Sequence, residues 1–410
     1  MRLLLQRLTR LTGMEGNGIE RARNDDLRIG ARELRERFMR IGFSGWRLAG
    51  QRLGIGRYIE YMLKHWNALL EPSDRVIIFV HEPFDRNSLG LSDQFRVEVI
   101  KPRLTNAVWE NILLPRHLRD IDVLFGPSYT VPVLYRGKTV VAIHSVDHAR
   151  HGPFSWWHDY SHELKYRLSA KVADLVIVNA HSVKERVERY YDIPAHKIEV
   201  VWLGADPVFR PIEDQAHLSA TRAKYLGSDT PFVLFVGGLS TRRNVPLLMR
   251  AFARLKREHG VPHKLLMVGP NRGQIPLAEL TAELGLHSSL IQIDGNFEHH
   301  SELAAIYAAA DLYVMPSAYE GFLLTLAEAI CCGTPVVTSS GSALGEVANG
   351  YAYTISDLTE DALTNAMWQV LSQPELRVRL RKQEIERSKL LRWEMTAKTT
   401  LELLRRVARS

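Results

Sequence analysis

The sequence contains only two cysteines in 410 residues, and they are neighbours, Cys331 and Cys332. Adjacent cysteines provide neither a disulfide framework nor the spaced pairs of a zinc site, so a reducing compartment fits best. No apolar run reaches the ~20 residues that a membrane-spanning helix needs. The leucines of the N-terminal stretch are interrupted by Arg7 and Arg10, which argues against a signal peptide. We therefore expect a cytoplasmic protein that at most lies against the inner face of the cytoplasmic membrane.

Recognisable nucleic-acid-binding modules are also lacking, and the basic residues are dispersed along the chain. The net charge is nevertheless +7, with an isoelectric point near 9.3, which suits an anionic ligand or an anionic membrane surface. Hydrophobic residues make up 46% and charged residues 24% of the chain, a composition typical of a globular protein. The length allows two domains, each with its own core. We expect no nucleic acid among the partners.

Residues 1–38 differ in composition from the rest of the chain. They hold nine arginines, no lysine and six acids, with only short apolar clusters. One hypothesis is that translation starts at Met39 and that this segment is a mis-called extension; the other is a genuine N-terminal arm. Intact-mass analysis of the native protein separates the two, because a mass that matches residues 1–410 excludes the first.

From Met39 onward, short β-branched apolar runs alternate with amphipathic helical patterns. The predicted strands are 40–45, 75–80, 140–145, 175–180 and 198–204, followed by 231–239, 264–270, 290–295, 311–317 and 334–340. This alternation is typical of parallel sheets flanked by helices. We predict an α/β protein with two doubly wound, Rossmann-like domains, whose facing strand ends form a ligand cleft.

A polar stretch separates the two sets of predicted strands and is interpreted as a linker. The expected divisions are an N-terminal extension at 1–38, a first domain at 39–205, a linker at 206–230, a second domain at 231–390, and a C-terminal helix at 391–410. We expect that last helix to pack back toward the first domain.

A glycine-containing turn, GIGRY, opens a helix soon after the first predicted strand. Gly54 and Gly56 allow the backbone to approach a ligand closely, and a helix N-terminus offers unpaired N–H groups to an anion. Ordinary packing explains such a turn equally well. Its spacing does not match the GxGxxG fingerprint of dinucleotide-binding proteins.

A second turn, VGGLSTRRN, follows the strand at 231–239 and contains two neighbouring arginines. Asn244 is the predicted N-cap of the next helix, with a proline in its first turn. Arg242 and Arg243 then lie beside a helix N-terminus, where a cation has the wrong sign for the helix dipole. A phosphate group bound between the arginines and the helix removes this conflict. The alternative is a solvated basic turn.

The segment 314–337 raises the main question of the sequence. Among its 24 residues only Glu320 and Glu328 are charged, and both are acids. A buried carboxylate without a partner costs several kcal/mol, so either the protein or a ligand must hydrogen-bond each of them. Two carboxylates ~12 Å apart along a helix are too distant for the pair of a retaining glycosidase. They are suitable acceptors for the hydroxyls of a polyol ligand, or alternatively caps for local backbone N–H groups.

Many motifs in one order carry a resemblance: GIGRY, HS after VVAI, ADLVIVNAHSVKE, KIEVVWLGAD, SELAAIYAAADLYVMPSAYEGF, EAICCGTPVVTS and ALGEV. Together they resemble the retaining nucleotide-sugar glycosyltransferases of family four, the group 1 glycosyl transferases with the GT-B fold. The resemblance extends from Met39 to the last helix. The GIGRY entry and the glycine–arginine turn resemble bacterial mannosyl- and rhamnosyl-type members, which implies GDP-mannose as the first candidate donor.

The resemblance also implies roles for individual residues. Glu328 would hold the ribose hydroxyls, Glu320 the hydroxyls of the donor sugar, and Arg243 the pyrophosphate. Both carboxylates would then be unpaired only until the ligand hydroxyls arrive. The implied donor-binding set is Gly54, Gly56, Gly237, Gly238, Arg242, Arg243, Gly321, Phe322, Glu328 and Glu346, and the implied catalytic set is His144, Glu320 and Arg243. No metal or other cofactor is implied, and the acceptor would be a glycan or a lipid-linked molecule.

Some positions depart from the family pattern. Leu323 and Thr325 replace the glycine and proline that usually follow the first acid, Gly238 replaces an arginine, and Ser145 replaces an aspartate. Two alternatives therefore remain open. One is a degenerate homologue that binds nucleotide or a partner protein without turnover. The other is a nucleotide-sugar phosphorylase or epimerase on the same fold.

Two further patterns are interpreted as structural, and a third leaves two interpretations open. Asp120 and Asp122 form a DxD sequence, but it precedes a strand and is interpreted as a solvated strand entry. His144, His148 and His151 have no glutamate partner that would complete a zinc-binding helix. The segment 152–171 mixes aromatic and basic residues, which suits either a membrane surface or ordinary core packing with a basic face.

Overall fold

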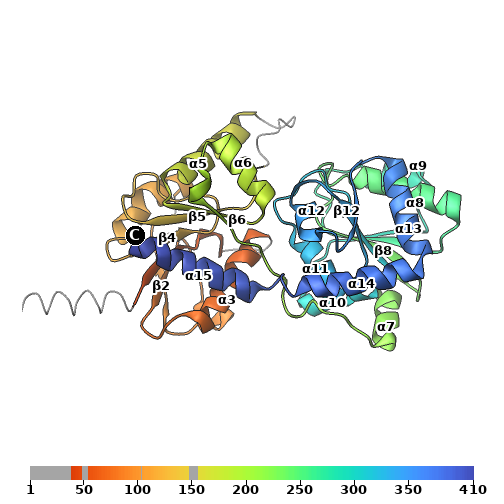
Figure 1. Ribbon diagram of the computed structural model, residues 1–410, viewed down its shortest axis with the longest axis horizontal. Helices are drawn as coiled ribbons and strands as arrows, with labels where there is room; N and C mark the ends of the chain where they lie inside the picture. Colours follow the sequence, from red (N-terminus) through yellow and green to blue (C-terminus); the bar gives the residue numbers. More distant parts are fainter. Residues whose placement is uncertain (1–37, 49–53, 103, 147–155) are drawn as a thin grey trace, which may run out of the picture.

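The computed structural model describes residues 38–48, 54–102, 104–146 and 156–410. Two separate parallel sheets lie side by side in it, each flanked by helices (Figure 1). The first sheet has seven strands in the order β3-β2-β1-β4-β5-β6-β7, and the second has six in the order β10-β9-β8-β11-β12-β13. This architecture of two doubly wound α/β domains confirms the predicted fold class.

The strands of the first sheet are β1 (Arg40–Ser44), β2 (Arg75–Val80), β3 (Phe95–Val99), β4 (Val123–Gly126), β5 (Thr139–Ile143), β6 (Leu175–Val178) and β7 (Ile198–Val200). Its helices are η1 (Trp46–Leu48), α3 (Ile55–Leu69), η2 (Arg86–Leu89), α4 (Asn106–Val108), the π-helix η3 (Trp109–Leu113), η4 (Leu114–His117), α5 (Trp156–Val172), α6 (His181–Tyr191) and η5 (Ala195–Lys197).

The strands of the second sheet are β8 (Phe232–Val236), β9 (Lys264–Val268), β10 (Leu290–Ile293), β11 (Leu312–Met315), β12 (Val336–Ser339) and β13 (Tyr353–Ile355). The remaining helices are α7 (Gln215–Leu226), α8 (Val245–His259), α9 (Leu277–Glu283), α10 (His300–Ala309), α11 (Leu324–Cys332), α12 (Ser342–Ala348), α13 (Glu360–Ser372), α14 (Pro374–Ser388) and α15 (Trp393–Arg409).

The strand order reverses beside the first strand of each sheet, between β1 and β4 and between β8 and β11. Ligands of open α/β sheets bind outside the carboxyl ends of the strands at such a reversal. The core strands β5, β8 and β11 are buried along their whole length, as expected for parallel strands covered by helices on both faces. The topology therefore predicts a ligand site at the loops that follow β1, β4, β8 and β11.

Two strands and one helix were not predicted from the sequence. The five residues of β3 include Arg96 and Glu98, and β13 has only three residues, so neither shows a buried apolar run. The expected linker contains α7, whose N-cap Asp214 accepts hydrogen bonds from two backbone N–H groups. This helix packs against α10 of the second domain. The segment 1–37 lies outside the described residues.

The C-terminal helix α15 crosses from the second domain back over the first, where it lies along α3 (Figure 1). The indole Nε1 of Trp66 donates a hydrogen bond to the Ala397 carbonyl at 2.9 Å, and the rings of Tyr61 and Trp393 stack at 4.9 Å. The chain thus passes twice between the domains, once before α7 and once before α15.

The DxD sequence lies at the amino end of β4, at the opposite edge from the carboxyl ends. Asp122 accepts a hydrogen bond from the backbone N–H of Arg40 at 2.7 Å, a local structural role. The described residues contain no group of three or more histidines, cysteines or acids able to hold a metal ion, while His148 and His151 lie outside them. None of the helices in the described part of the chain is long and apolar enough to span a membrane.

Glu110, in the π-helix η3, provides a test of pH-dependent stability. It is 5% exposed, its partner is the Thr130 hydroxyl, and burial raises the pKa of its carboxyl from 4.5 to about 7. Because the folded state binds this proton more tightly than the unfolded state, stability should fall as pH rises from 4.5 to 7, by at most about 3 kcal/mol. We expect Glu110→Gln, which carries no charge, to be more stable than wild type at pH 8 but not at pH 4.5. Urea unfolding at both pH values measures this, and an unchanged pH slope in the variant would contradict it.

Candidate functional site

Glu328 lies in α11 and is almost completely buried, at 1% exposure. One carboxylate oxygen accepts a hydrogen bond from Arg57 Nη2 at 2.6 Å, and the other accepts from the Tyr307 hydroxyl at 3.1 Å. Arg57 belongs to α3, so this ion pair joins the two domains. We expected this carboxylate to stay unpaired until ligand hydroxyls arrive. That expectation is wrong, because protein groups already bond both of its oxygens.

Arg57 was not singled out from the sequence, although it belongs to the GIGRY motif. Burial acts to lower its pKa, but the nearby Glu328 carboxylate overrides this effect and raises the pKa, so the guanidinium stays charged. The residue lies in the first turn of α3, where a cation opposes the helix dipole. The argument that drew attention to Arg243 applies equally to Arg57 and could have found it.

Glu320 lies in the loop between β11 and α11 and is 7% exposed. Arg243 Nε at 3.0 Å and the Ser317 hydroxyl at 3.1 Å both donate to its Oε1, while Arg242 Nη1 lies 3.0 Å from its Oε2. The Glu320 backbone N–H donates to the Ser342 hydroxyl at 3.2 Å. This carboxylate was also expected to be unpaired, which is wrong for the same reason. Two guanidinium groups share one carboxylate, so this corner retains one surplus positive charge.

The glycine pair after β8 makes room for Arg243. Gly237 has φ +143, a conformation that favours glycine, and a Cβ there would lie 2.2 Å from Arg243 Nη1. The same Nη1 donates to the carbonyl of Gly238 at 3.2 Å, whereas a Cβ on Gly238 would meet only ordinary contacts. Asn244 is the N-cap of α8, as predicted, but its amide donates to the Pro316 carbonyl and does not cap the helix.

The loop after Glu320 touches the first domain directly. A Cβ on Gly321 would lie 1.9 Å from the carbonyl oxygen of His144. Phe322 is buried at 3% exposure, and the Tyr319 hydroxyl accepts a hydrogen bond from the backbone N–H of Val146 at 3.3 Å. Only a residue without a side chain allows the two domains to approach this closely.

His144 follows β5 and is held by the first domain through both ring nitrogens. Nε2 lies 2.7 Å from the Pro127 carbonyl, which can only accept, and Nδ1 lies 2.8 Å from the Asn179 side-chain amide. Burial lowers the pKa of His144 to about 4, so the ring is neutral at pH 7. Its predicted catalytic role stays a prediction, but the ring offers no titrating proton at neutral pH.

Gly54 and Gly56 lie at the start of α3. Gly54 is its N-cap with φ +51, a conformation that favours glycine, and Gly56 is buried in the first turn. Arg57 follows Gly56 directly, and its guanidinium contacts Glu328 of the second domain. Their contact with a donor phosphate stays a prediction.

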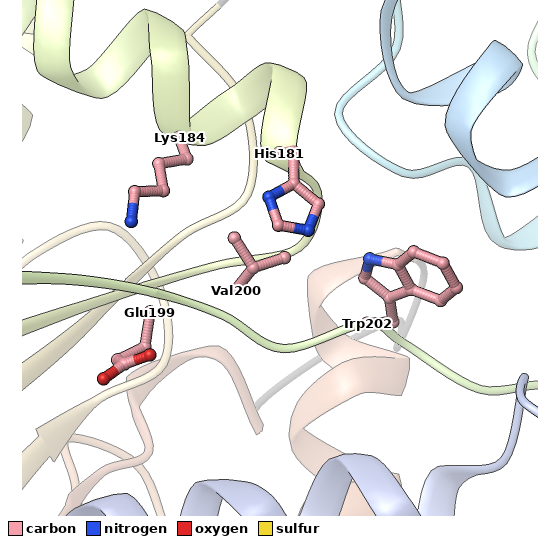
Figure 2. A pocket seen from close by; sticks show the side chains of 5 residues that line it. All are labelled: His181, Lys184, Glu199, Val200 and Trp202. Carbon is pink, nitrogen blue, oxygen red and sulfur yellow. The ribbon is translucent and has the colours of Figure 1, made fainter. Parts of the chain in front are cut away.

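Glu346, in α12, binds the first domain rather than a group of its own domain. Its carboxylate accepts hydrogen bonds from the backbone N–H groups of His181 and Ser182, at the start of α6, and from the Trp202 indole. His181 and Trp202 also line a hollow of about 390 Å³ beside this contact, with Lys184, Glu199 and Val200 (Figure 2). The predicted donor contact of Glu346 stays a prediction, while the observed contact caps a helix across the domain junction.

The ion pair between Arg57 and Glu328 should stabilise the contact between the two domains. Each of Arg57→Met and Glu328→Gln should destabilise the protein by about 3 kcal/mol, because each leaves a buried polar or charged group without its partner. The double variant should cost less than the sum of the two, by about 1–3 kcal/mol. Thermal unfolding at pH 7 measures all four proteins. Lys64→Met with Glu60→Gln, a more exposed pair on the same helix α3, is the matched control and should be close to additive. Additive costs for the buried pair would contradict the expected coupling.

Two family models match consecutive parts of the chain. The model of glycosyl transferases group 1 matches residues 220–387, and the model of glycosyltransferase family 4 matches residues 54–209. The boundary between them coincides with the passage from the first domain to α7. Together they include the second sheet, every strand of the first sheet except β1, and the residues of the interdomain site.

Curated relatives of the chain carry glycosyltransferase names, in agreement with these models. The D-inositol 3-phosphate glycosyltransferase of Corynebacterium urealyticum is 34% identical over 242 residues, 57% of each chain, and the O-antigen chain mannosyltransferase B of Escherichia coli is 26% identical over 230 residues, 56% of this chain and 60% of the relative. The alignments thus span little more than half of the relatives' length.

Solved structures match over a larger share of the chain. Sucrose-phosphate synthase from Thermosynechococcus elongatus superposes with a TM-score of 0.72 at 21% identity, over 90% of this chain and 98% of that one. Anabaena HepE in complex with UDP-glucose superposes with a TM-score of 0.71 at 17% identity, over 89% and 99%. Identities this low establish the fold, which is the GT-B arrangement of two Rossmann-like domains. The chain belongs to the group 1 glycosyl transferases and has a family four glycosyltransferase domain in its first half.

Proposed function

We propose that the protein is a retaining glycosyltransferase that moves a sugar from a nucleotide-sugar donor to a glycan or lipid-linked acceptor. The observation that carries the proposal is the arrangement around Glu320. This carboxylate is held between two arginines, and the loop that follows it meets the first domain at Gly321 and His144. A carboxylate for sugar hydroxyls and a surplus positive charge for a diphosphate thus lie together at the domain junction.

The chemistry would be mainly electrostatic. The bond between the anomeric carbon and the diphosphate oxygen breaks, and its electron pair leaves with the diphosphate. Arg243, Arg242 and the N-terminus of α8 stabilise the charge that develops there. The acceptor hydroxyl oxygen bonds to the anomeric carbon on the same face, and its proton passes to the leaving phosphate. No side chain is assigned as a nucleophile, and the proposal requires no metal ion.

Donor hydroxyls would replace protein partners on the two carboxylates. At Glu328 the ribose hydroxyls compete with Arg57 and the Tyr307 hydroxyl, so donor binding would loosen the ion pair that joins the domains. The strength of that pair then opposes nucleotide binding, and the free energy of the donor's own interactions with the protein has to exceed it.

GDP-mannose is our first candidate donor, for synthesis of a cell-surface polysaccharide such as lipopolysaccharide. The mannosyltransferase name of the Escherichia coli relative supports mannose, while the UDP-glucose complex of HepE keeps UDP-sugars as competitors. The test is release of nucleoside diphosphate from a panel of GDP- and UDP-sugars, followed by calorimetry for any silent nucleotide. One responsive sugar identifies the donor. No binding of any nucleotide would overturn the transferase proposal.

A peripheral membrane contact at the cytoplasmic face is supported by helix α5. Leu164, Leu168 and Val172 follow one another at helical spacing and are 44%, 39% and 41% exposed, and Lys165 and Lys171 are exposed beside them. An apolar stripe with flanking lysines suits an anionic lipid surface, where a lipid-linked acceptor would be found. Sedimentation with phosphatidylglycerol vesicles tests this contact, and equal recovery with phosphatidylcholine vesicles alone would contradict the role of charge.

The degenerate-homologue alternative rested on Leu323 and Thr325. Leu323 has φ +70, so the backbone keeps the left-handed conformation that a glycine would adopt despite carrying a side chain. The Thr325 hydroxyl lies 2.9 Å from the hydroxyl of Tyr313. The loop thus holds Leu323 in a strained left-handed conformation and gives the Thr325 hydroxyl a partner. The contacts of Glu320 with Arg242 and Arg243, rather than these two positions, support turnover over a merely binding role.

A further inference from the structure

Arg47 carries a positive charge that no acid in the described part of the chain neutralises. It lies in η1, directly after β1, at the carboxyl edge of the first sheet. Its guanidinium lies 4.4 Å from the ring centre of Trp46, and its buried Nε has no hydrogen-bond partner among the described residues. Within the same described ranges, Arg47 makes neither a hydrogen bond nor an ion pair. A partly buried cation without a partner is costly, so an anion is the expected complement.

Three other arginines at the domain junction each contact an acid. Arg57 is paired with Glu328, and both Arg242 and Arg243 contact Glu320. Arg47 differs from them in having no acid opposite it in the described structure. Its charge therefore remains available for a ligand on the side of the first domain.

A cluster of aromatic residues lies at the same edge of the first sheet as Arg47. Tyr129 and Tyr166 stack with their ring centres 4.5 Å apart, and Tyr129 packs against His144 at 5.4 Å. Tyr129 has φ +70, a strained conformation for a bulky residue that is typical of functional sites. Burial lowers the pKa of His144, and the charge of Arg47 lowers it further, which places the guanidinium within electrostatic reach of this cluster.

Two buried hydroxyls of the same edge also lack partners among the described residues. The Ser44 hydroxyl lies at the end of β1, and the Ser128 hydroxyl lies two residues beyond the end of the neighbouring strand β4. Buried polar atoms in native proteins are almost always hydrogen-bonded, so two such hydroxyls at one edge point to a ligand with several acceptor oxygens.

The cluster adjoins the place where transfer would occur. His144 contacts Tyr129 through its ring and Gly321 through its carbonyl oxygen, and Gly321 follows Glu320 directly. The cluster thus lies across the domain junction from the donor carboxylate. An acceptor bound there would approach the donor sugar from the first domain.

On the basis of the proposed transferase function, we propose that Arg47 binds a phosphate group of the acceptor, so that the acceptor is a phosphorylated polyol or the phosphodiester of a lipid-linked molecule. A guanidinium presents its donors in a planar fork that matches phosphate oxygens. The Ser44 and Ser128 hydroxyls provide further donors at the same edge. This assignment separates the anion of the acceptor, on the first domain, from the diphosphate of the donor, on the second.

The test uses the full chain with the donor site first saturated by the nucleoside diphosphate that the panel identifies. Three probes are then titrated: inorganic phosphate, vesicles of phosphatidylinositol, and vesicles of phosphatidylcholine. The fluorescence of Trp46 is isolated by comparison with Trp46→Phe, since the ring lies directly against the guanidinium. Arg136→Gln is the matched control, because Arg136 is exposed and precedes β5 at the opposite edge of the sheet.

We expect inorganic phosphate or phosphatidylinositol vesicles to bind wild type and Arg136→Gln, and Arg47→Gln to bind at least tenfold more weakly. Binding of free phosphate identifies a soluble phosphorylated acceptor, and binding of phosphatidylinositol vesicles alone identifies a lipid-linked one. Unchanged phosphate affinity in Arg47→Gln would overturn the proposal. So would an equal loss of nucleoside diphosphate affinity, which would assign Arg47 to the donor.

Failure of the two proposals is distinguishable. If no nucleotide binds, the transferase proposal fails, and the phosphate titration is run without nucleotide. The comparison of Arg47→Gln with Arg136→Gln then still reports whether Arg47 is an anion site.

Discussion

Replacing Glu320 by alanine is expected to lower donor turnover at least ~100-fold, on the scale of removing one preorganised electrostatic group from an active site. The carboxylate holds Arg242, Arg243 and the Ser317 hydroxyl in place. Without it the two guanidinium groups repel each other and lose the position from which they would stabilise the leaving diphosphate. Release of nucleoside diphosphate from the responsive donor measures the effect.

Two further variants define what the loss means. Glu320→Gln keeps the shape of the side chain and one acceptor oxygen, so it isolates the contribution of the charge and should lie between wild type and alanine. Glu298→Ala removes an exposed acid from the same domain and should leave turnover unchanged. If Glu320→Ala kept more than a tenth of wild-type turnover at an unchanged nucleotide affinity, the assignment of Glu320 to the donor sugar would be wrong.

The sequence was sufficient for the elements whose signal is local. The buried strands β2, β5, β6, β8 and β9 each show a continuous apolar run, and all lie where they were predicted. The loop with Glu320 and the glycine–arginine turn were also recognised, because each motif is contained in a few consecutive residues. β3 and β13 were missed, since the first alternates with charged residues and the second is only three residues long.

Contacts between the domains could not be derived in the same way. Arg57 and Glu328 are 271 positions apart, and their pairing depends on how one domain is placed against the other. No local pattern records that placement. We therefore wrongly expected both carboxylates to stay unpaired until a ligand binds, because no local pattern in the sequence shows their partners. In this arrangement of the domains the first domain supplies Arg57 to Glu328, and the second domain pairs Glu320 with its own arginines.

Gly321→Ala is expected to lower turnover by about 100-fold while leaving nucleotide binding close to wild type. The added Cβ would lie 1.9 Å from the His144 carbonyl oxygen, whereas carbon and carbonyl oxygen approach to about 3.3 Å even in weak hydrogen bonds. The obstacle is backbone, which cannot rotate away as a side chain can, so the domains must separate by more than 1 Å as an order of magnitude. Displacements of that size are known to cost about a hundredfold in rate. Turnover and the radius of gyration from small-angle scattering measure the two consequences.

Gly341→Ala is the matched control for this variant. Gly341 is the N-cap of α12, directly before the Ser342 hydroxyl that accepts from Glu320, and a Cβ there meets nothing within 4 Å. The same chemical change close to the same loop should therefore leave turnover and compactness as in wild type. If Gly321→Ala were as active and as compact as Gly341→Ala, the contact between Gly321 and His144 would not be required for the reaction. Reduced turnover with unchanged nucleotide affinity, in contrast, would identify domain closure at Gly321 as the step that brings Glu320 to the side of the cleft where the acceptor is bound.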